Sequence, residues 1–343
     1  MTTYEKWLLA LVDPQNPCRH PPRQKLSLED ISALCFHAEL HGVLPIVLKK
    51  VDHYLRHEPG TLLLEPDSSP EVAAAIQPLQ KRLAEKAAIT LFLEAESRRI
   101  MVQIHTEGAA AIPLKGSDFA KRLYDPPALR SYGDIDLLVR GSDWDVVRAL
   151  MSRLGYVTQE EPMKHAGGYS EQTWEHPAMT GAQVEVHSNL VNSPTVRRGV
   201  SVKYEDVPLA PGLDGRLRAT PAGLLVIAAV HGAASHGFDR LQHACDIVQI
   251  VRGRAGPVDE SSLRECLART GAGLSVALGL DLVERIFAET AATDLLERLK
   301  LRWPRRLTRL LITPPLIARS QGLRRRGTSW RRQTLRQMLK TRR

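Results

Sequence analysis

The chain has 343 residues, 43% of them hydrophobic and 25% charged, which allows two or three domains with a sizeable core and is ordinary for a soluble globular protein. Aromatic residues make up only 5%, which argues against an aromatic base-stacking platform, and four widely spaced cysteines without a CxxC pair argue against a zinc site or a disulfide framework. The net charge of +9 is unevenly spread: residues 301–343 hold 14 Lys or Arg and no acid, so the remaining 300 residues hold 33 basic and 38 acidic residues, a net charge of −5.

No part of the sequence reads as a targeting or membrane segment. The start, MTTYEKWLLALVDPQNP, lacks the basic residues and the longer apolar run of a signal peptide. The longest later apolar run, AGLLVIAAV at 222–230, is about half of what spans a bilayer. Together with the cysteine usage, this predicts a cytoplasmic protein without an integral membrane segment.

Residues 1–108 are predicted to form a helical N-terminal region, because their apolar residues recur at helical spacing. Pro45 indicates a kink or the start of a new helix after HGV. The Pro- and Ser-rich residues 59–71 are typical of a loop. Residues 71–107 then carry the strongest helical pattern in the chain, and this helix is expected to end at Gly108.

Residues 109–210 are predicted to form an α/β core, because the period of the apolar pattern changes there. Short strands are expected at 110–114 and 134–139, in YVTQ and YSEQTWEH, and at 182–190, with an amphipathic helix at 142–155. The overall fold class is therefore α+β.

Residues 211–300 are predicted to form a helical C-terminal domain, with two helices hinged near Gly237. Residues 301–343 follow as a basic C-terminal tail. Such a tail favours polyanions, for example RNA or an acidic peptide, although it could equally be a solvated helical end packed on the body.

The stretch DIDLLV at 134–139 places two acids where a buried strand is expected. Side chains alternate across a strand, so Asp134 and Asp136 point to one face, about 7 Å apart, while Ile135 and Leu137 point to the other. Two such carboxylates can share Mg²⁺, which prefers carboxylate oxygen and bridges to phosphate. Taken alone, a solvent-facing DxD pair would be the more common interpretation.

A third acid comes from AQVEVHS, another predicted strand. Its alternation puts Glu185 and His187 on one face and Val184 and Val186 on the other. This matches the pattern of the two aspartates, and it predicts that Glu185 joins them from a neighbouring strand.

Upstream, IPLKGSDFAKRLYDPPALRSYG offers groups for phosphate. Gly116 and Ser117 stand at a strand-to-helix turn, where backbone N–H groups and the helix dipole favour an anion. Lys115 and Arg130 flank this turn and could neutralise a triphosphate.

The order LKGS…LY…R…DIDLLV…GY…EVH resembles the nucleotidyltransferases of the DNA polymerase β superfamily, and more narrowly the bacterial uncharacterised nucleotidyltransferase family. HGVLP at 41–45 and HGAASHGFDRLQHACDI at 231–247 match further elements of that family, so the resemblance covers roughly residues 30–250. One departure stands out: sixteen residues separate Ser117 from Asp134, more than in the wider superfamily, and the added loop is expected to reshape the triphosphate site.

The resemblance implies a polymerase β-like core, a small mixed sheet with flanking helices, set between helical N- and C-terminal regions. It implies Mg²⁺ (or Mn²⁺) as cofactor and an NTP as co-substrate, with ATP as the first candidate. Asp134 and Asp136 would bind the metal, and Glu185 would bind metal or act as a general base. Gly116 and Ser117 would hold the β- and γ-phosphates.

The resemblance also makes Lys115 and Arg130 neighbours of the phosphates. His187 could contact metal or substrate, or be a packed histidine.

The later helices supply further candidate cleft residues, His231, His236 and Arg240. His236 and Arg240 are four residues apart and are expected to share a helix face. Asp246 is expected to bridge Arg240 or His243. For each of these residues, a capping or core hydrogen-bonding role is the alternative.

The function predicted from this set is a nucleotidyltransferase (EC 2.7.7) that moves a nucleoside monophosphate from an NTP to a hydroxyl or phosphate acceptor and releases pyrophosphate. The acceptor could be a peptide, a protein, a small molecule such as an aminoglycoside or sugar phosphate, or RNA. Relatives of the family lie beside peptide-modification and capsule genes, which favours a peptide or a saccharide.

Two alternatives stay open at this level. The first is a non-catalytic module that binds nucleotide or nucleic acid. The second is a phosphotransferase or glycosyltransferase whose DxD holds a nucleotide donor.

Overall fold

The computed structural model describes residues 1–343 except 17, 19, 159–167, 180, 213, 320–329 and 341–343. The predicted basic tail is therefore described at 301–319 and 330–340, and its other residues lie outside the described part.

The N-terminal region is helical, as predicted. It consists of α1 (Thr3–Leu11), α2 (Leu28–Leu40), α3 (Leu44–His57), the short α4 (Pro59–Leu62) and the long α5 (Ser69–Thr106). Pro45 lies in the first turn of α3, so it starts a new helix instead of kinking one. The prediction of a loop over 59–71 was wrong in part, because this stretch includes α4, a 3₁₀ turn at Pro66–Ser68 and the start of α5, and because Leu62 and Leu63 are buried.

A five-stranded mixed sheet follows, in the order β1-β2-β5-β4-β3. Its strands are β1 (Ala111–Pro113), β2 (Ile135–Val139), β3 (Val157–Thr158), β4 (Glu171–Glu175) and β5 (Gln183–His187), with α6 (Ser117–Leu123) and α7 (Trp144–Arg153) between them. β2 and β5 pair in parallel, and the other pairs are antiparallel. A separate ribbon joins β6 (Leu209–Pro211) to β7 (Leu217–Ala219).

The C-terminal region is helical. It contains α9 (Pro221–Val230), a π-helical turn η6 (His231–His236), α10 (Leu241–Val251), α11 (Glu260–Thr270), α12 (Gly273–Phe287), α13 (Thr290–Leu299), α14 (Arg305–Leu311), α15 (Pro314–Ala318) and α17 (Trp330–Leu339). Gly237 adopts a left-handed conformation with φ of 63° directly after η6, so the predicted hinge near Gly237 is confirmed.

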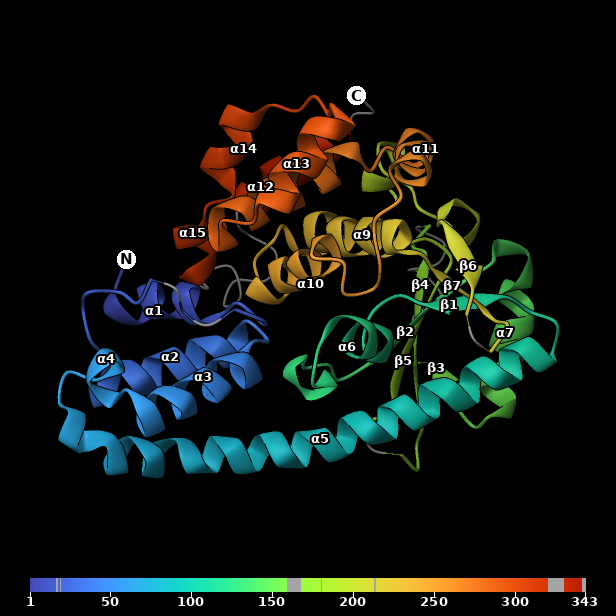
Figure 1. Ribbon diagram of the computed structural model, residues 1–343. Helices are drawn as coiled ribbons and strands as arrows, with labels where there is room; N and C mark the ends of the chain where they lie inside the picture. The colour runs from blue at the N-terminus through green and yellow to red at the C-terminus, as the bar shows by residue number, and fades with distance from the viewer. Residues whose placement is uncertain are drawn as a thin grey trace.

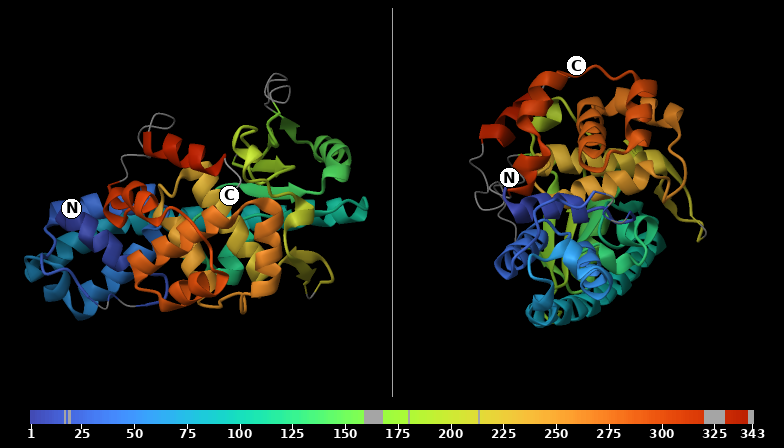
Figure 2. Two further views of the ribbon diagram at one scale, coloured as in Figure 1. Left: turned by 90° about the horizontal axis from the view of Figure 1, so that it is seen from above. Right: turned by 60° about the vertical axis from the view of Figure 1, so that its left-hand side comes forward.

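The elements enclose two hydrophobic clusters. The larger one joins the N-terminal helices to α9–α13 and reaches α17, and the smaller one lies between the sheet, α7 and the second half of α5. α5 contributes Val72 and Ile76 to the first cluster and Leu93 and Ile100 to the second. Figures 1 and 2 show α5 running along the base of the molecule, from the N-terminal helices to the sheet.

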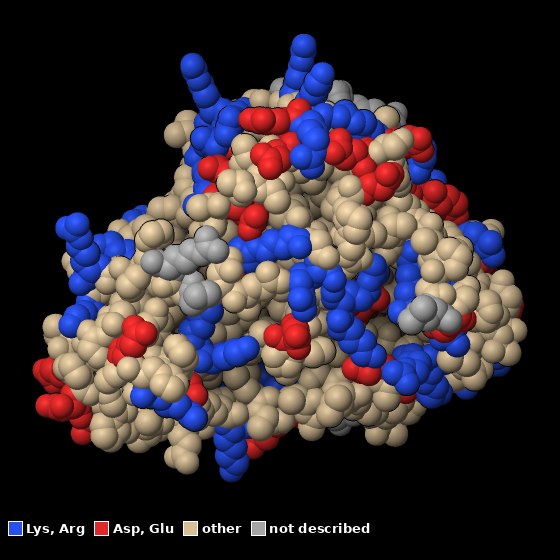
Figure 3. All heavy atoms as spheres, in the orientation of Figure 1, with Lys and Arg blue, Asp and Glu red and all other residues tan. Residues whose placement is uncertain are grey.

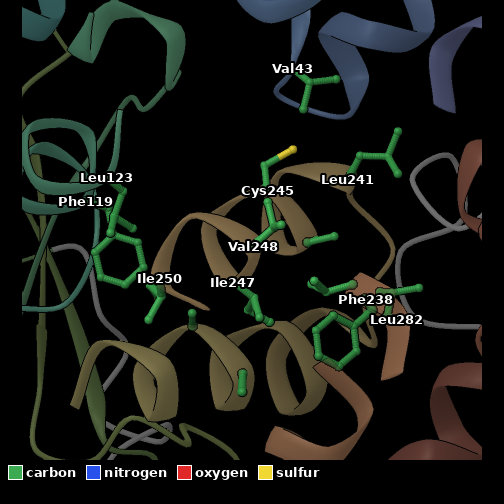
Figure 4. Close-up of a cluster of buried hydrophobic side chains, with 14 of the residues drawn as sticks. Val43, Phe119, Leu123, Phe238, Leu241, Cys245, Ile247, Val248, Ile250 and Leu282 are labelled. Atoms are coloured by element: carbon green, nitrogen blue, oxygen red, sulfur yellow. The ribbon is translucent and has the colours of Figure 1, made fainter. Parts of the chain in front are cut away.

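Helix α10 lies at the centre of the larger cluster. Figure 4 shows its Ile250 beside Phe119 and Leu123 of α6, and its Cys245 facing Val43 ahead of α3. Because α10 also packs on α9 and α12, it connects the N-terminal helices, the α/β core and the C-terminal helices through one set of buried side chains.

The α+β fold class is thus confirmed. No described helix combines the length and the apolar composition that crossing a membrane requires. Figure 3 shows Lys and Arg side chains gathered across the middle of the face that Figure 1 presents, between the levels of α5 and α12, so positive charge is exposed over the body of the molecule as well as at its C-terminal end.

Phe238 provides a test of this packing. Its side chain is fully buried, its ring fills the space beside Gly232 of η6, and it also approaches Gly279 of α12. Phe238→Ala is expected to lower the free energy of unfolding by about 3–5 kcal/mol, because the cavity cannot close fully. Phe92→Ala, at a partly exposed position on α5, should cost about 1 kcal/mol or less. Urea denaturation of both variants measures the difference, and equal losses would contradict this account.

Candidate active site

The predicted carboxylates meet on two adjacent strands. β2 and β5 are separated in sequence by β3 and β4, yet they pair in parallel, with Asp136 opposite Glu185 and Leu138 opposite His187. The prediction that Glu185 joins the aspartates from a neighbouring strand is therefore confirmed. Asp134 lies one residue ahead of β2, and its side chain is 29% exposed, whereas that of Asp136 is 1% exposed.

Lys115 holds the two aspartates together. Its Nζ lies 3.3 Å from Oδ2 of Asp134 and 2.9 Å from Oδ2 of Asp136. Burial by itself lowers the pKa of Lys115, but the charges of Asp136, Asp134 and Glu185 outweigh burial and raise it. The ammonium group is therefore charged at neutral pH, and it offsets the repulsion between the acids.

His187 occupies the other side of Asp136. Its Nε2 is 3.5 Å from Oδ1 of Asp136 and 3.7 Å from Oε2 of Glu185, and its Nδ1 is 3.7 Å from Oε2 of Glu171. Burial lowers the pKa of His187, but the three carboxylates raise it by more, to about 9. An imidazolium at this position is thus a second cation among the acids.

Glu171 was missed from the sequence. It starts β4, directly opposite His187 in the antiparallel pair with β5, and it faces the same side of the sheet as Glu185. Burial raises the pKa of Glu171, and the charges of Glu185 and Asp136 add to that rise. The alternation in YSEQTWEH indicated a strand, but only the pairing with β5 shows that this acid joins the cluster.

The donor set fits a divalent cation. One ligand atom each from Asp136, Glu185 and His187 lies within 4.8 Å of the others. Both carboxylate oxygens of Asp136 are buried, and the groups beside them are cations: Lys115 lies 2.9 Å from Oδ2, and His187 lies 3.5 Å from Oδ1. A buried carboxylate is stable only beside positive charge, so this donor set could also hold a divalent cation.

The turn after β1 has the geometry that the sequence predicted. The backbone N–H of Leu114 donates to the carbonyl of Asp136 at 3.0 Å, which ties the turn to β2. Gly116 follows with φ of 59° and ψ of −122°, a conformation that disfavours a side chain, and a Cβ there would lie 3.3 Å from the carbonyl oxygen of Asp134. α6 starts at Ser117.

A cleft of about 970 Å³ opens above the acids. Lys115, Asp134, Asp136 and Glu185 line it, whereas Gly116 and Ser117 are not among the described residues on its wall. Its other wall comes from the C-terminal helices and includes the predicted cleft residues, listed here with their neighbours: His231, His236, Asp239, Arg240, His243, Arg332 and Arg336.

Three of these wall residues are histidines in contact. The ring centroids of His231 and His236 are 4.7 Å apart, those of His236 and His243 are 4.8 Å apart, and those of His231 and His243 are 5.4 Å apart. Burial, followed by nearby positive groups, lowers the pKa of both His231 and His243, which keeps these two rings neutral. The prediction that His236 and Arg240 share a helix face was wrong, because η6 ends at His236 and α10 begins only at Leu241.

Arg130 is committed to a buried ion pair. Its Nε donates to Oδ1 of Asp246 at 2.8 Å and its Nη2 to Oδ2 at 2.9 Å, while the hydroxyl of Tyr124 donates to Oδ1 at 2.7 Å. The prediction that Asp246 bridges Arg240 or His243 was therefore wrong: its partner is Arg130, 116 residues away in sequence. Arg130 also reaches the carbonyl of Gly116 at 3.4 Å, so it supports the turn from behind.

α10 fixes the same loop at two more points. Gln242 donates to the carbonyl of Ser131 at 2.7 Å, and Gln249 donates to the carbonyl of Leu123 at 2.6 Å. The helix thereby fixes the position of the segment from the end of α6 to β2 beside the cleft.

Comparison with known proteins gives the family of the chain. A family model described as "Uncharacterised nucleotidyltransferase" matches residues 27–288, well over half of the chain. At the level of class, the chain is therefore a nucleotidyltransferase-type transferase, and it belongs to the uncharacterised nucleotidyltransferase family. No curated protein and no solved structure matches the chain.

The Arg130–Asp246 pair predicts a large stability effect. Arg130→Ala leaves the Asp246 carboxylate buried with no cation, so it should lower the free energy of unfolding by about 3–5 kcal/mol. Arg130→Met combined with Asp246→Leu should recover most of this loss, because it removes both buried charges. Arg140→Ala, which breaks the more exposed pair with Asp143, should cost about 1 kcal/mol or less. Chemical denaturation measures all three, and a small effect of Arg130→Ala alone would contradict the ion pair.

His187 predicts a pH dependence of stability. Its folded-state pKa lies above the ordinary value of 6.5, so its protonation stabilises the fold fully below about pH 6.5, and this contribution is lost as the pH rises through about 9. In EDTA, the difference in unfolding free energy between wild type and His187→Gln should be largest near pH 6 and should shrink towards pH 9.5. His53→Gln, at an exposed position, is the matched control. A difference that grows with pH would have the wrong sign.

Proposed function

We propose that the protein is a Mg²⁺-dependent nucleotidyltransferase, with Mn²⁺ as the alternative ion, that transfers a nucleoside monophosphate from an NTP to a hydroxyl or phosphate acceptor. The observation that carries this proposal is the cluster of Asp134, Asp136 and Glu185 from two adjacent strands at the floor of the cleft. Membership of the nucleotidyltransferase family supports the reaction class at a coarse level.

Asp134, Asp136 and Glu185 would hold the divalent cation. When bound, it would neutralise phosphate charge and lower the pKa of an attacking hydroxyl. Carboxylate oxygens suit Mg²⁺, and the imidazole of His187 beside them, once the entering cation displaces its proton, would also suit Mn²⁺. In the free protein, the Lys115 ammonium lies between the two aspartates. We expect it to move towards the phosphates of an entering nucleotide, where its positive charge would be balanced by phosphate oxygens.

The transfer step requires a base and a cradle. The acceptor oxygen would form a bond to the α-phosphorus, the bond from that phosphorus to the bridging oxygen of the β-phosphate would break, and pyrophosphate would leave. Glu185 would take the proton of the acceptor hydroxyl. The contact with His187 lowers the pKa of Glu185 most, burial opposes that shift, and the charge of Lys115 lowers the pKa further, so the carboxylate stays ionised at neutral pH. Gly116 and Ser117 would hold the β- and γ-phosphates at the turn.

Arg130 fits a positioning role better than direct contact with phosphate. It lines the cleft, but three of its guanidinium contacts are already made to Asp246 and Gly116. We propose that Arg130 sets the position of the Gly116–Ser117 turn.

ATP is the first donor to try. A peptide, a protein, a small molecule and an RNA end are the acceptor classes to compare.

Loss of the acids should abolish transfer. In assays with each of the four NTPs labelled at the α-phosphate, with Mg²⁺ and acceptor panels of peptides, saccharides and RNA, wild type should give a product heavier by one nucleoside monophosphate. Asp134→Asn/Asp136→Asn should lower the rate by at least about 100-fold, as expected when the groups that stabilise transition-state charge are removed. Asp145→Asn, with its side chain 93% exposed on α7, is the matched control.

Equal transfer by the double variant and wild type would reject this mechanism. A product heavier by a phosphate or a hexose would point instead to a phosphotransferase or a glycosyltransferase.

A further inference from the structure

Helix α17 brings part of the basic tail to the cleft. Leu335 and Leu339 are 1% exposed and join the larger hydrophobic cluster, so the helix is packed against the body. A Cβ on Gly199 would overlap the carbonyl oxygen of Leu339, which shows how closely the end of α17 approaches the segment after β5. This helix lies beyond residues 27–288, the part of the chain that the family model matches.

Arginines of α17 dock on the end of the π-helical turn. Arg331 donates to the carbonyl of Gly237 at 3.5 Å, Arg332 donates to the carbonyl of Ser235, and Arg336 donates to the carbonyl of Ala234 at 3.4 Å. Carbonyls at the end of a helical segment lack intrahelical partners and carry partial negative charge, so guanidinium groups are favoured there.

Arg332 and Arg336 also line the cleft, where Arg240 joins them. Among the described residues, no carboxylate lies within ion-pair distance of any of these three guanidinium groups. Asp239 also lines this wall; burial raises its pKa, whereas the charges of Arg332, Arg240 and Arg331 lower it. Three cations and one acid leave an excess of positive charge on this wall, opposite the carboxylates of the sheet.

Hydrogen-bond donors on this wall are left without acceptors. Nε of Arg240 and Nε of Arg332 are buried, and neither meets an acceptor among the described residues. Nε2 of His243, a residue that is 6% exposed, also lacks a partner in the described structure, and it donates only in the tautomer that carries the proton there. Buried donors without acceptors, beside guanidinium groups that have no carboxylate partner among the described residues, indicate a ligand with several acceptor oxygens and negative charge.

We propose that Arg240, Arg332 and Arg336 form a subsite for a phosphate group of a substrate. Guanidinium groups match phosphate oxygens in geometry, and the excess of two positive charges suits a phosphate dianion better than a single carboxylate. The subsite rests on the proposed function only for the expectation that phosphate-bearing substrates enter this cleft. Its phosphate comes either from the triphosphate of the donor or from a phosphorylated acceptor.

The test measures binding, so it does not depend on turnover. Isothermal titration calorimetry would use four probes in turn: ATP and AMP with Mg²⁺, inorganic tripolyphosphate in EDTA, and inorganic phosphate in the presence of saturating ATP. The variants are Arg332→Gln/Arg336→Gln and, as a control, Arg306→Gln, which removes one exposed charge from a residue that does not line the cleft.

If the subsite holds the donor, the double variant should weaken the binding of ATP and tripolyphosphate by about 10-fold or more and leave the binding of AMP unchanged, since it loses charge-assisted hydrogen bonds to phosphate oxygens. If it holds an acceptor, ATP should be unaffected, while the binding of inorganic phosphate beside ATP should be lost. Either outcome supports the subsite. Affinities for all four probes that match wild type, or that fall equally in Arg306→Gln, would overturn it.

Gly199→Ala gives an independent check that changes no arginine. The added methyl group would displace the end of α17 at Leu339, so it should weaken the same probe as the double variant. Thermal unfolding of each variant confirms that the fold is retained. A wild-type protein that binds tripolyphosphate but neither binds nor transfers from NTPs would reject the proposed function and leave the subsite standing.

Discussion

The candidate site depends on one ammonium group between two like-charged side chains. Asp134 and Asp136 repel each other on one face of a strand, and Asp136 is buried, so neither would be stable there without a cation. The path of the backbone brings that cation, the Lys115 ammonium, to the two acids. Leu114 is hydrogen-bonded to Asp136, so the next residue, Lys115, stands beside both acids, and the positive φ of Gly116 then turns the chain away into α6. A residue that balances the charges in the free protein is well placed to balance phosphate charge when a nucleotide enters.

The second support of the site comes from the helical half of the molecule. Gln242, Asp246 and Gln249 are spaced four and three residues apart on α10, so they share one face, and that face holds the loop between α6 and β2. α10 is also the centre of the larger hydrophobic cluster. The α/β core and the C-terminal helices therefore do not act as separate units at the cleft: a helix from one half positions the turn and the strand of the other.

Much of this arrangement followed from local pattern, and the rest did not. Alternation in DIDLLV and AQVEVHS was enough to place three acids on matching faces, and Gly116 marked the turn. The pairing of β2 with β5 skips two strands, so Glu171 joined the cluster through a register that no local pattern contains. The pairing of Arg130 with Asp246 bridges 116 residues and was out of reach for the same reason. In the basic tail, fourteen similar residues gave no sign that Arg332 and Arg336 would reach the cleft.

Helix α5 has a mechanical consequence for the whole molecule. Its 38 residues make a rod about 57 Å long, anchored at one end in the larger hydrophobic cluster and at the other in the cluster beneath the sheet. Any rotation of one cluster against the other would have to bend this rod, which resists because backbone hydrogen bonds join its successive turns; Pro78, inside the helix, has no N–H and leaves one of these bonds unmade. The floor of the cleft is thus held rigidly, and any widening of the cleft is left to the opposite wall, where α17 packs through Leu335 and Leu339 and through arginine contacts with backbone carbonyls.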